Sequence, residues 1–512
     1  MKKRQLFLAM SLLIFNYGIA QTFDIQNYGA IGDGKTLNTE AVQKAVDACS
    51  ANRGGKVIVP TGIFIIGTVN LKSNVHLYLE SGAILRGSSN LNDYTPYNEV
   101  HYGMLYAENA ENIIISGFGN IDGNGDYFFD HNKAKKIEWG GTQYTRQKEN
   151  FRKVMDGGIG DGPLVPKDRP YQMFIFSNCK RVTVNDILVT GAPMWTMHFA
   201  DCDGVRVDGI RLYTNMLVPN ADGIDITSCK NVIVTDCDIR SGDDAIAIVG
   251  YAHHFEIPGY QQIRHLSENI IVSNCNLQSY SSGIRIGFLD QNTVRNINIS
   301  NCNITNSTRG IGIFLRDEGS LENINISNIN IETKLRTGDW WGNGEPIHIS
   351  AIRGKDSVKL GRIKNLKFDN ITCKSENGIL IYGTEESVIE NVTFNNVSLE
   401  IIDSKLNGVA GGNIDLRGCL GEESQLFQRD LPAFFAQYVS DLKIDNFRLD
   451  WTDTRMEFFT HGLEVINFEN LRITEFEGTA SPVNPNAFPI YIENGVNADI
   501  KVKTRVVKKN VK

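Results

Sequence analysis

The chain has 512 residues and a formal net charge of -8, with 59 acidic and 51 basic residues. This acidic balance is poorly suited to nucleic acid, and we expect no nucleic-acid partner. The length would suggest about three globular domains, unless a repeat architecture gathers the residues into one continuous core.

The start of the chain has the pattern of a secretory signal peptide. A basic start (residues 2–4), an apolar run (residues 6–15) and small residues at 18–20 precede Gln21. We therefore predict that residues 1–20 are a signal peptide and that the mature chain starts near Gln21. No later run of about 18 or more apolar residues could span a bilayer, so we expect a periplasmic or secreted protein with no membrane span.

The next segment has the pattern of an amphipathic helix. Asn38 or Thr39 can cap its start, apolar residues recur at helical spacing from Val42 to Cys49, and Gly54-Gly55 end it.

A nine-residue pattern then recurs from residue 112 to residue 473, with Asn at the first place, alternating apolar residues, and Asn or Asp at the sixth place. Its closest copies start 23 to 27 residues apart, for example at Asn269, Asn296 and Asn323. Such a period of short alternating strands predicts an all-β fold, a right-handed parallel β-helix (solenoid), with Asn at corners where it tolerates the left-handed conformation and bonds neighbouring backbone. Residues 21–512 would form a single parallel β-helix domain.

The ends of the solenoid need covers, because an open coil exposes unpaired strand edges. We predict an N-terminal cap over about residues 21–60, including the helix, and a C-terminal cap and frayed basic tail over about residues 480–512. Wider gaps between repeats, and the segment from about 126 to 167, predict inserted loops that wall a cleft. The nine cysteines contain no Cys-x-x-Cys pair, so we expect buried thiols rather than metal ligands.

The repeats can be aligned on their apolar pairs, which places polar residues in two columns across successive coils. One column contains Trp195, Asp222, Asp244, Ser282 and Arg309, and the other contains His198, Asp225, Ala247, Arg285 and Gly312. Adjacent coils lie ~4.8 Å apart, so Asp222 and Asp244 should approach each other with Asp243 alongside. Such crowding allows one carboxyl to hold a proton near neutral pH, as glycoside hydrolysis requires.

These residues resemble glycoside hydrolase family 28, the polygalacturonase family, from about Thr22 to Ile473. The family motif Asn-Thr-Asp is similar to residues 220–222, and its Asp-Asp pair is similar to Asp243-Asp244. The resemblance implies that Asp243 is the general acid, that Asp222 and Asp244 position and activate water, and that the anomeric carbon is inverted, with about 6.5–9.5 Å between acid and base.

Two family signatures are absent, and other residues are candidates for their tasks. Ser282 stands where the family has His, and residues 312–314 read Gly-Ile-Phe where it has Arg-Ile-Lys. Arg285 and Arg309 occupy neighbouring columns and could bind a substrate carboxylate bidentately, although Arg285 could instead pair with Asp225.

Further candidates for substrate contact are Asn220 in the first motif, His198 near it, and the aromatic pair Trp340 and Trp341 in an inserted loop, whose ring faces suit sugar C–H surfaces. His198 could equally be a structural hydrogen-bonding residue, and the two tryptophans could pack on the β-helix.

We therefore predict an inverting glycosidase that cleaves α-galacturonide linkages in pectin-derived polysaccharide or oligosaccharide, of the exo-galacturonidase or rhamnogalacturonan type. Its partner would be an anionic glycan, and we expect a monomer with no cofactor and no metal. The alternatives are a hydrolase of another anionic or sulfated galactan, a Ca²⁺-dependent polysaccharide lyase, and a non-catalytic glycan-binding β-helix.

Overall fold

The computed structural model is a parallel β-helix, and it describes residues 21–251, 258, 266–288 and 292–512. The predicted signal peptide, residues 1–20, lies outside the described residues. Within those ranges, no helix is both long and apolar enough to cross a membrane.

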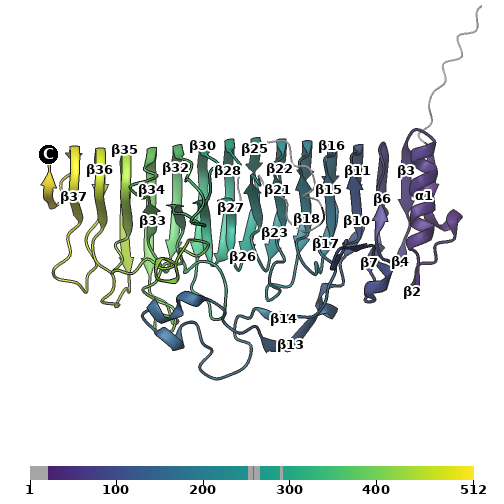
Figure 1. The fold of residues 1–512 in the computed structure, drawn as a ribbon, viewed down its shortest axis with the longest axis horizontal. Coiled ribbons are helices and arrows are strands. Elements are labelled where there is room, and N and C mark those ends of the chain that lie inside the picture. Colours follow the sequence, from purple (N-terminus) through teal and green to yellow (C-terminus); the bar gives the residue numbers. More distant parts are fainter. Residues whose placement is uncertain (1–20, 252–257, 259–265, 289–291) are drawn as a thin grey trace, which may run out of the picture.

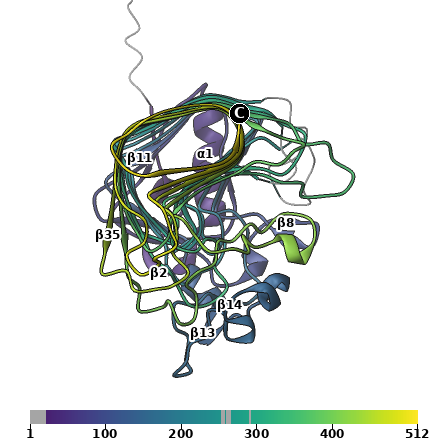
Figure 2. The same ribbon diagram turned by 90° about the vertical axis from the view of Figure 1, so that its left-hand side faces the viewer.

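The coils stack along one axis and share a sheet of 34 strands (Figure 1). Each coil contributes to three faces, and the coils superimpose when viewed along the axis (Figure 2). The first face consists of β3 (Gly55–Val59), β6 (Val75–Leu79), β11 (Glu111–Gly117), β16 (Lys180–Asn185), β19 (Asp203–Asp208), β22 (Lys230–Thr235), β25 (Ser267–Ser273), β28 (Val294–Ser307), β30 (Leu321–Thr333), β32 (Ile363–Ser375), β34 (Ile389–Ile402), β35 (Phe434–Thr452), β36 (Leu463–Glu477) and β37 (Ile490–Lys501).

The second face carries the candidate site. It consists of β5 (Val69–Asn70), β10 (Leu105–Glu108), β15 (Phe174–Ser177), β18 (Met197–Ala200), β21 (Ile224–Thr227), β24 (Ile246–Val249), β27 (Ser282–Phe288), β29 (Arg309–Leu315), β31 (Ile347–Ala351) and β33 (Ile379–Tyr382). The third face consists of β4 (Gly62–Ile66), β7 (Ala83–Gly87), β12 (Asn120–Asp122), β17 (Leu188–Thr190), β20 (Arg211–Tyr213), β23 (Asp238–Ser241) and β26 (Asn276–Ser279).

The corners confirm the expected role of asparagine and add a contact. Asn269, Asn296 and Asn323 have φ near +58° to +59°, which asparagine tolerates better than most residues. Their side-chain amides bond one another across coils, from Asn296 Nδ2 to Asn269 Oδ1 at 3.2 Å and from Asn323 Nδ2 to Asn296 Oδ1 at 3.1 Å. The corners are therefore joined through side chains, whereas we had expected bonds to backbone.

Inward side chains stack on their equivalents, so the core is a set of continuous columns. Ile297 pairs in register with Ile270 on one side and with Ile324 on the other. Phe368 and Phe394 stack with ring centroids 4.6 Å apart. The nine cysteines are buried and free, as expected.

The N-terminal end is closed as predicted. Helix α1 (Thr39–Ala51) turns Val42, Ala45, Val46 and Cys49 inward against the first coils, and it lies at the right-hand end in Figure 1. Strands β1 (Thr22–Asp24) and β2 (Asp33–Leu37) precede it.

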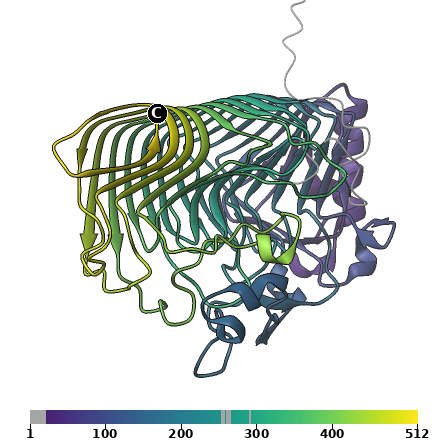
Figure 3. The same ribbon diagram turned by 60° about the vertical axis from the view of Figure 1, so that its left-hand side comes forward.

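The predicted C-terminal cap and frayed tail are wrong. Strand β37 (Ile490–Lys501) pairs in parallel with β36, and β38 (Val506–Val511) pairs with β37. The apolar and basic residues of this region continue the solenoid because their alternation matches the coil before them, and the last coil stands open at the front of Figure 3.

Truncating a stacked core ring should destabilise the fold strongly. Phe368→Ala would leave a cavity beside Phe394 and lower the free energy of unfolding by about 3–5 kcal/mol. Lys367→Ala, at a side chain 53% exposed in the same strand, should change it by less than about 0.5 kcal/mol. Chemical denaturation followed by intrinsic fluorescence measures both, and equal midpoints would contradict the stacked core.

Candidate active site

The three carboxylates Asp222, Asp243 and Asp244 lie in turns that immediately precede β21 and β24. Both turns are tightly packed: a Cβ at Gly242 would stand 2.1 Å from the carbonyl oxygen of Val218, so only glycine fits there. If the alternation of the strands continued through these residues, Asp222 and Asp244 would point into the core. The turns prevent this. One oxygen from each of the three carboxylates lies within 4.8 Å of the others.

The predicted strand register on this face is confirmed. His198 pairs with Asp225, Asp225 with Ala247, Ala247 with Arg285, and Arg285 with Gly312. In the other column, Ser282 pairs with Arg309.

Asp243 is fixed by the backbone of the preceding coil. The Asn220 N–H donates to Asp243 Oδ2 at 3.1 Å, and Asn220 itself has φ of +58°. Arg169 holds that turn, because its guanidinium donates to Asn220 Oδ1 at 3.1 Å and to the carbonyl oxygens of Pro193 and Pro219.

Asp244 accepts more hydrogen bonds than Asp243 does. Ser281 Oγ donates to its Oδ1 at 2.8 Å, the Ser282 N–H donates to the same oxygen at 2.9 Å, and Arg285 Nε donates to Oδ2. Ser281, rather than Ser282, is thus the side chain that contacts Asp244, while Ser282 Oγ accepts a bond from Arg309 at 3.2 Å.

These surroundings give the carboxyls different proton affinities. Burial, and then the charge of Asp244, raise the pKa of Asp243 to about 6. Burial, and then Asp225 and Asp243, raise the pKa of Asp222 well above its usual range. Burial would also raise the pKa of Asp244, but Arg285 and the hydrogen bonds from Arg285, Ser281 and Ser282 lower it below its ordinary value. Neighbouring carboxyls whose pKa values are pushed apart are typical of an acid and base pair.

The carboxylates border a cavity of about 170 Å³. Its lining adds Ser281, Arg285, Arg309, Phe314, Arg316, Trp341, Asp415, Arg417, Trp195, Asn220, Tyr251 and Phe288 to the three aspartates. Of the predicted contact residues, Asn220, Arg285, Arg309 and Trp341 therefore border it.

The other three predicted contact residues lie elsewhere. Ser282 is buried, and its N–H and Oγ are bonded to Asp244 and Arg309. His198 is buried, shares a hydrogen bond with Thr227 at 3.2 Å and packs edge-on against Trp195. Trp340 is also buried, and its indole N–H donates to the Asp161 carbonyl at 2.9 Å. The suggestion that Trp340 stacks on a sugar is therefore wrong for this conformation, because no ring face is open.

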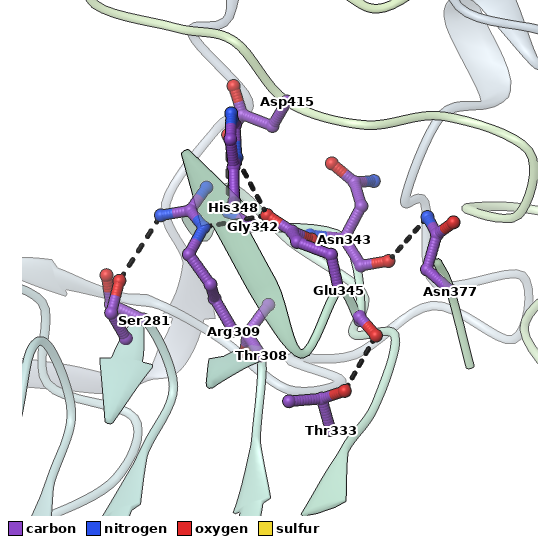
Figure 4. Close-up of polar contacts among 12 residues, drawn as sticks. Ser281, Thr308, Arg309, Thr333, Gly342, Asn343, Glu345, His348, Asn377 and Asp415 are labelled. Atoms are coloured by element: carbon purple, nitrogen blue, oxygen red, sulfur yellow. Dashed lines mark hydrogen bonds and ion pairs between the residues drawn. The ribbon is translucent and has the colours of Figure 1, made fainter. Parts of the chain in front are cut away.

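The two arginines have partners that the alignment did not predict. Arg285 pairs with Asp244, which lies one coil before it, and not with Asp225, which lies two coils before it. Arg309 pairs with buried Glu345 at 2.7 Å, and Glu345 also lies 3.4 Å from His348 Nδ1 (Figure 4).

Three inserted segments meet beside the cavity. Arg152, from the segment between β12 and β15, donates to the carbonyl oxygens of Trp340 and Gly342 in the second insertion. Arg417 lies in the third inserted segment, between β34 and β35. It pairs with Asp415 and with Asp339 at 2.7 Å. Its guanidinium lies over the rings of Trp341 and Trp139. Figures 1 and 2 show these loops, with β13 (Phe129–Ala134) and β14 (Leu164–Pro166), gathered on one side of the solenoid.

Sequence reasoning missed Arg316, Asp415, Arg417, Tyr251, Phe288 and Phe314 as lining residues. Phe314 and Arg316 follow Gly312 at alternate positions past the aligned column, so strand alternation could have indicated them. Asp415 and Arg417 lie in an insertion that no repeat describes, and no signal in the sequence placed them here.

Comparison with known proteins identifies the family. The model of "Glycosyl hydrolases family 28" matches residues 49–410, more than half of the chain. The chain belongs to glycosyl hydrolases family 28. It is 28% identical over 257 residues to an exo-poly-alpha-D-galacturonosidase of Dickeya chrysanthemi, covering 44% of this chain and 42% of that protein. A probable polygalacturonase of Vitis vinifera is 26% identical over 246 residues, covering 45% and 44%.

The alignments with such curated relatives span about half of their length. Among solved structures, the Yersinia enterocolitica family 28 exopolygalacturonase superposes with a TM-score of 0.61 at 20% identity, covering 95% of this chain and 79% of that chain. The Thermotoga maritima exopolygalacturonase gives 0.51 at 21% identity, covering 75% and 88%. These likenesses confirm that this family 28 chain is a right-handed parallel β-helix.

Proposed function

We propose that the protein is an inverting glycosidase that removes α-galacturonide units from the ends of pectin-derived chains. The observation that carries the proposal is that Asp243 and Asp244 adjoin at the wall of one cavity but have different partners. Asp244 accepts bonds from Arg285, Ser281 and the Ser282 N–H, whereas Asp243 accepts bonds from the backbone N–H groups of Asn220 and Asp244. The relatives described above are polygalacturonases and exopolygalacturonases, which agrees with the proposal.

In this mechanism Asp243 protonates the glycosidic oxygen. Its pKa of about 6 keeps the acid form available in mildly acidic solution. Asp244 stays ionised through Arg285, and its Oδ2 retains a lone pair that can take the proton of the attacking water. Asp222, whose carboxyl also borders the cavity, positions that water.

The size and closure of the cavity favour cleavage at chain ends. Its volume of about 170 Å³ is below the roughly 300–1,000 Å³ of pockets that take drug-sized ligands. The loops joined by Arg152 and Arg417 stand at the same side as the cavity, so a single terminal sugar fits this site better than the middle of a polymer. The basic and apolar residues at the start of the chain support secretion.

Asp243→Asn should abolish release of reducing sugar from galacturonan or rhamnogalacturonan oligomers, with a loss of at least about 100-fold expected from removing a general acid. Asp208→Asn, at a half-buried carboxylate on β19 and outside the cavity lining, is the matched control and should retain activity. A panel that includes anionic algal galactans identifies the substrate class. Ultraviolet-absorbing product with calcium dependence would instead indicate a lyase, and binding without release from any substrate would indicate a glycan-binding protein.

The pH profile of kcat/KM should be bell-shaped. Activity falls as pH rises through about 6, because Asp243 loses its proton. It also falls below the ordinary Asp range of about 3.9, because Asp244, whose pKa is lowered, must be ionised. Arg285→Met removes the charge that lowers both pKa values, so both limbs should move to higher pH. Unmoved limbs in Arg285→Met would contradict these assignments.

Inversion rests on the family resemblance, since the nearest carboxylate oxygens lie within 4.8 Å, closer than the roughly 6.5–9.5 Å typical of inverting pairs. Both oxygens of Asp244 are occupied by donors, which disfavours it as a covalent nucleophile. The first product released should therefore have the β configuration, as proton NMR of the anomeric signal during early turnover would show. An α product would mean retention and a covalent intermediate.

A further inference from the structure

Arg316 differs from the other arginines that line the cavity. Arg285 pairs with Asp244, Arg309 with Glu345, and Arg417 with Asp415. Arg316 forms no ion pair with any described residue. Its guanidinium donates to the carbonyl oxygens of Leu315 and Ser350, to Ser350 Oγ at 2.9 Å and to the Leu416 carbonyl.

The environment of Arg316 leaves its charge uncompensated. The side chain is 1% exposed, and its Nε lacks a hydrogen-bond partner. Burial lowers its pKa to about 10, so it remains a cation at neutral pH. Burying a cation without a counter-charge costs free energy, because the charge loses its water. An anion bound beside the cation would offset that loss.

The carboxylates around Arg316 already serve other groups. Asp415 and Asp339 pair with Arg417, and Glu345 pairs with Arg309. Asp317, the next residue, is also buried, but its Oδ1 accepts the Glu318 N–H at 2.8 Å and it forms no ion pair with Arg316 in the described part of the chain. His348 adds no positive charge, because burial lowers its pKa to about 4. Figure 4 shows part of this group, with Arg309, Glu345, His348 and Asp415 converging beside Asn343.

Arg316 borders the same cavity as the three aspartates, but from the other end of the second face. Asp244 precedes β24, whereas Arg316 follows β29, two coils further along the axis, which is a step of roughly 10 Å. Phe314 separates it from Arg309, with guanidinium-to-ring distances of 5.4 and 4.8 Å. Arg316 and the three aspartates thus line different parts of one cavity.

We infer that Arg316 binds the anionic substituent, a carboxylate or a sulfate ester, of the sugar unit held in the cavity and so orients its glycosidic bond toward Asp243. This assigns the anion-binding task to Arg316 rather than to Arg285, whose charge already serves Asp244. The inference deepens the proposed function and rests on it for the orientation of the bond, but the anion site can be measured without turnover.

The test is isothermal titration of the Asp243→Asn protein with galacturonic acid, galactose 6-sulfate and galactose. At least one anionic sugar should bind about tenfold or more tightly than galactose, and the anion that does so distinguishes a carboxylate site from a sulfate site. Adding Arg316→Gln should bring the anionic and neutral affinities within about threefold of each other. Arg206→Gln, at an exposed arginine on β19, is the matched control and should leave the preference intact.

A folded Arg316→Gln protein with an unchanged preference would overturn the inference, as would a parent protein that binds galactose as tightly as both anions. If circular dichroism shows that Arg316→Gln does not fold, Arg316→Lys takes its place: it keeps the charge but not the guanidinium geometry, and should weaken the preference at least about threefold. An unchanged preference there also overturns the inference. An anion preference that depends on Arg316, in a protein that releases no sugar from any substrate, would support this site while refuting the proposed hydrolysis.

Discussion

Residues at equivalent positions of successive coils lie directly over one another, and the rest of the molecule depends on this register. It builds the core from columns such as Ile270, Ile297 and Ile324. It also brings Asp222 and Asp244, which lie in the turns just before β21 and β24, to the same point of two adjacent coils. A shift of one residue in β24 would turn its apolar side chains outward. The same shift would also move Asp244 away from Asp222.

The periodicity of the sequence was sufficient to predict most of the solenoid. Alternating apolar residues and corner asparagines defined each coil, and the alignment of those coils predicted the pairing of His198, Asp225 and Arg285 correctly. The C-terminal coil was misjudged because residues 480–512 were interpreted as a cap and tail, although the apolar residues from Ile490 also fit the alternation of a strand. Apolar content alone does not distinguish the two, whereas register with the preceding coil does.

Side-chain partners were less predictable than strand positions. The columns placed Arg285 near the carboxylates, but whether it would bind Asp225, Asp244 or a ligand depended on the direction of a long flexible side chain. Most of the charged residues around Arg316 come from insertions with no repeat, so the repeat pattern does not predict where they lie. Trp340 and Trp341 illustrate this: adjacent in an insertion, one is buried beneath the loop and the other borders the cavity.

The hydrogen bonds between corner asparagines of successive coils also determine how the protein would respond to slow chemical modification. Each asparagine shares its amide with the next coil, as Asn296 does with Asn269, and Asp203 and Asp441 accept amides from Asn231 and Asn470 where an aspartate occurs. Deamidation is a slow conversion of Asn to Asp, and asparagine is among the residues depleted in heat-stable proteins. One such event at Asn296 would keep the bond that it accepts from Asn323 but lose the bond that it donates to Asn269. Two events on adjacent coils would also place like charges ~4.8 Å apart with no amide between them, so damage at neighbouring corners would cost more stability than the same damage at separate corners.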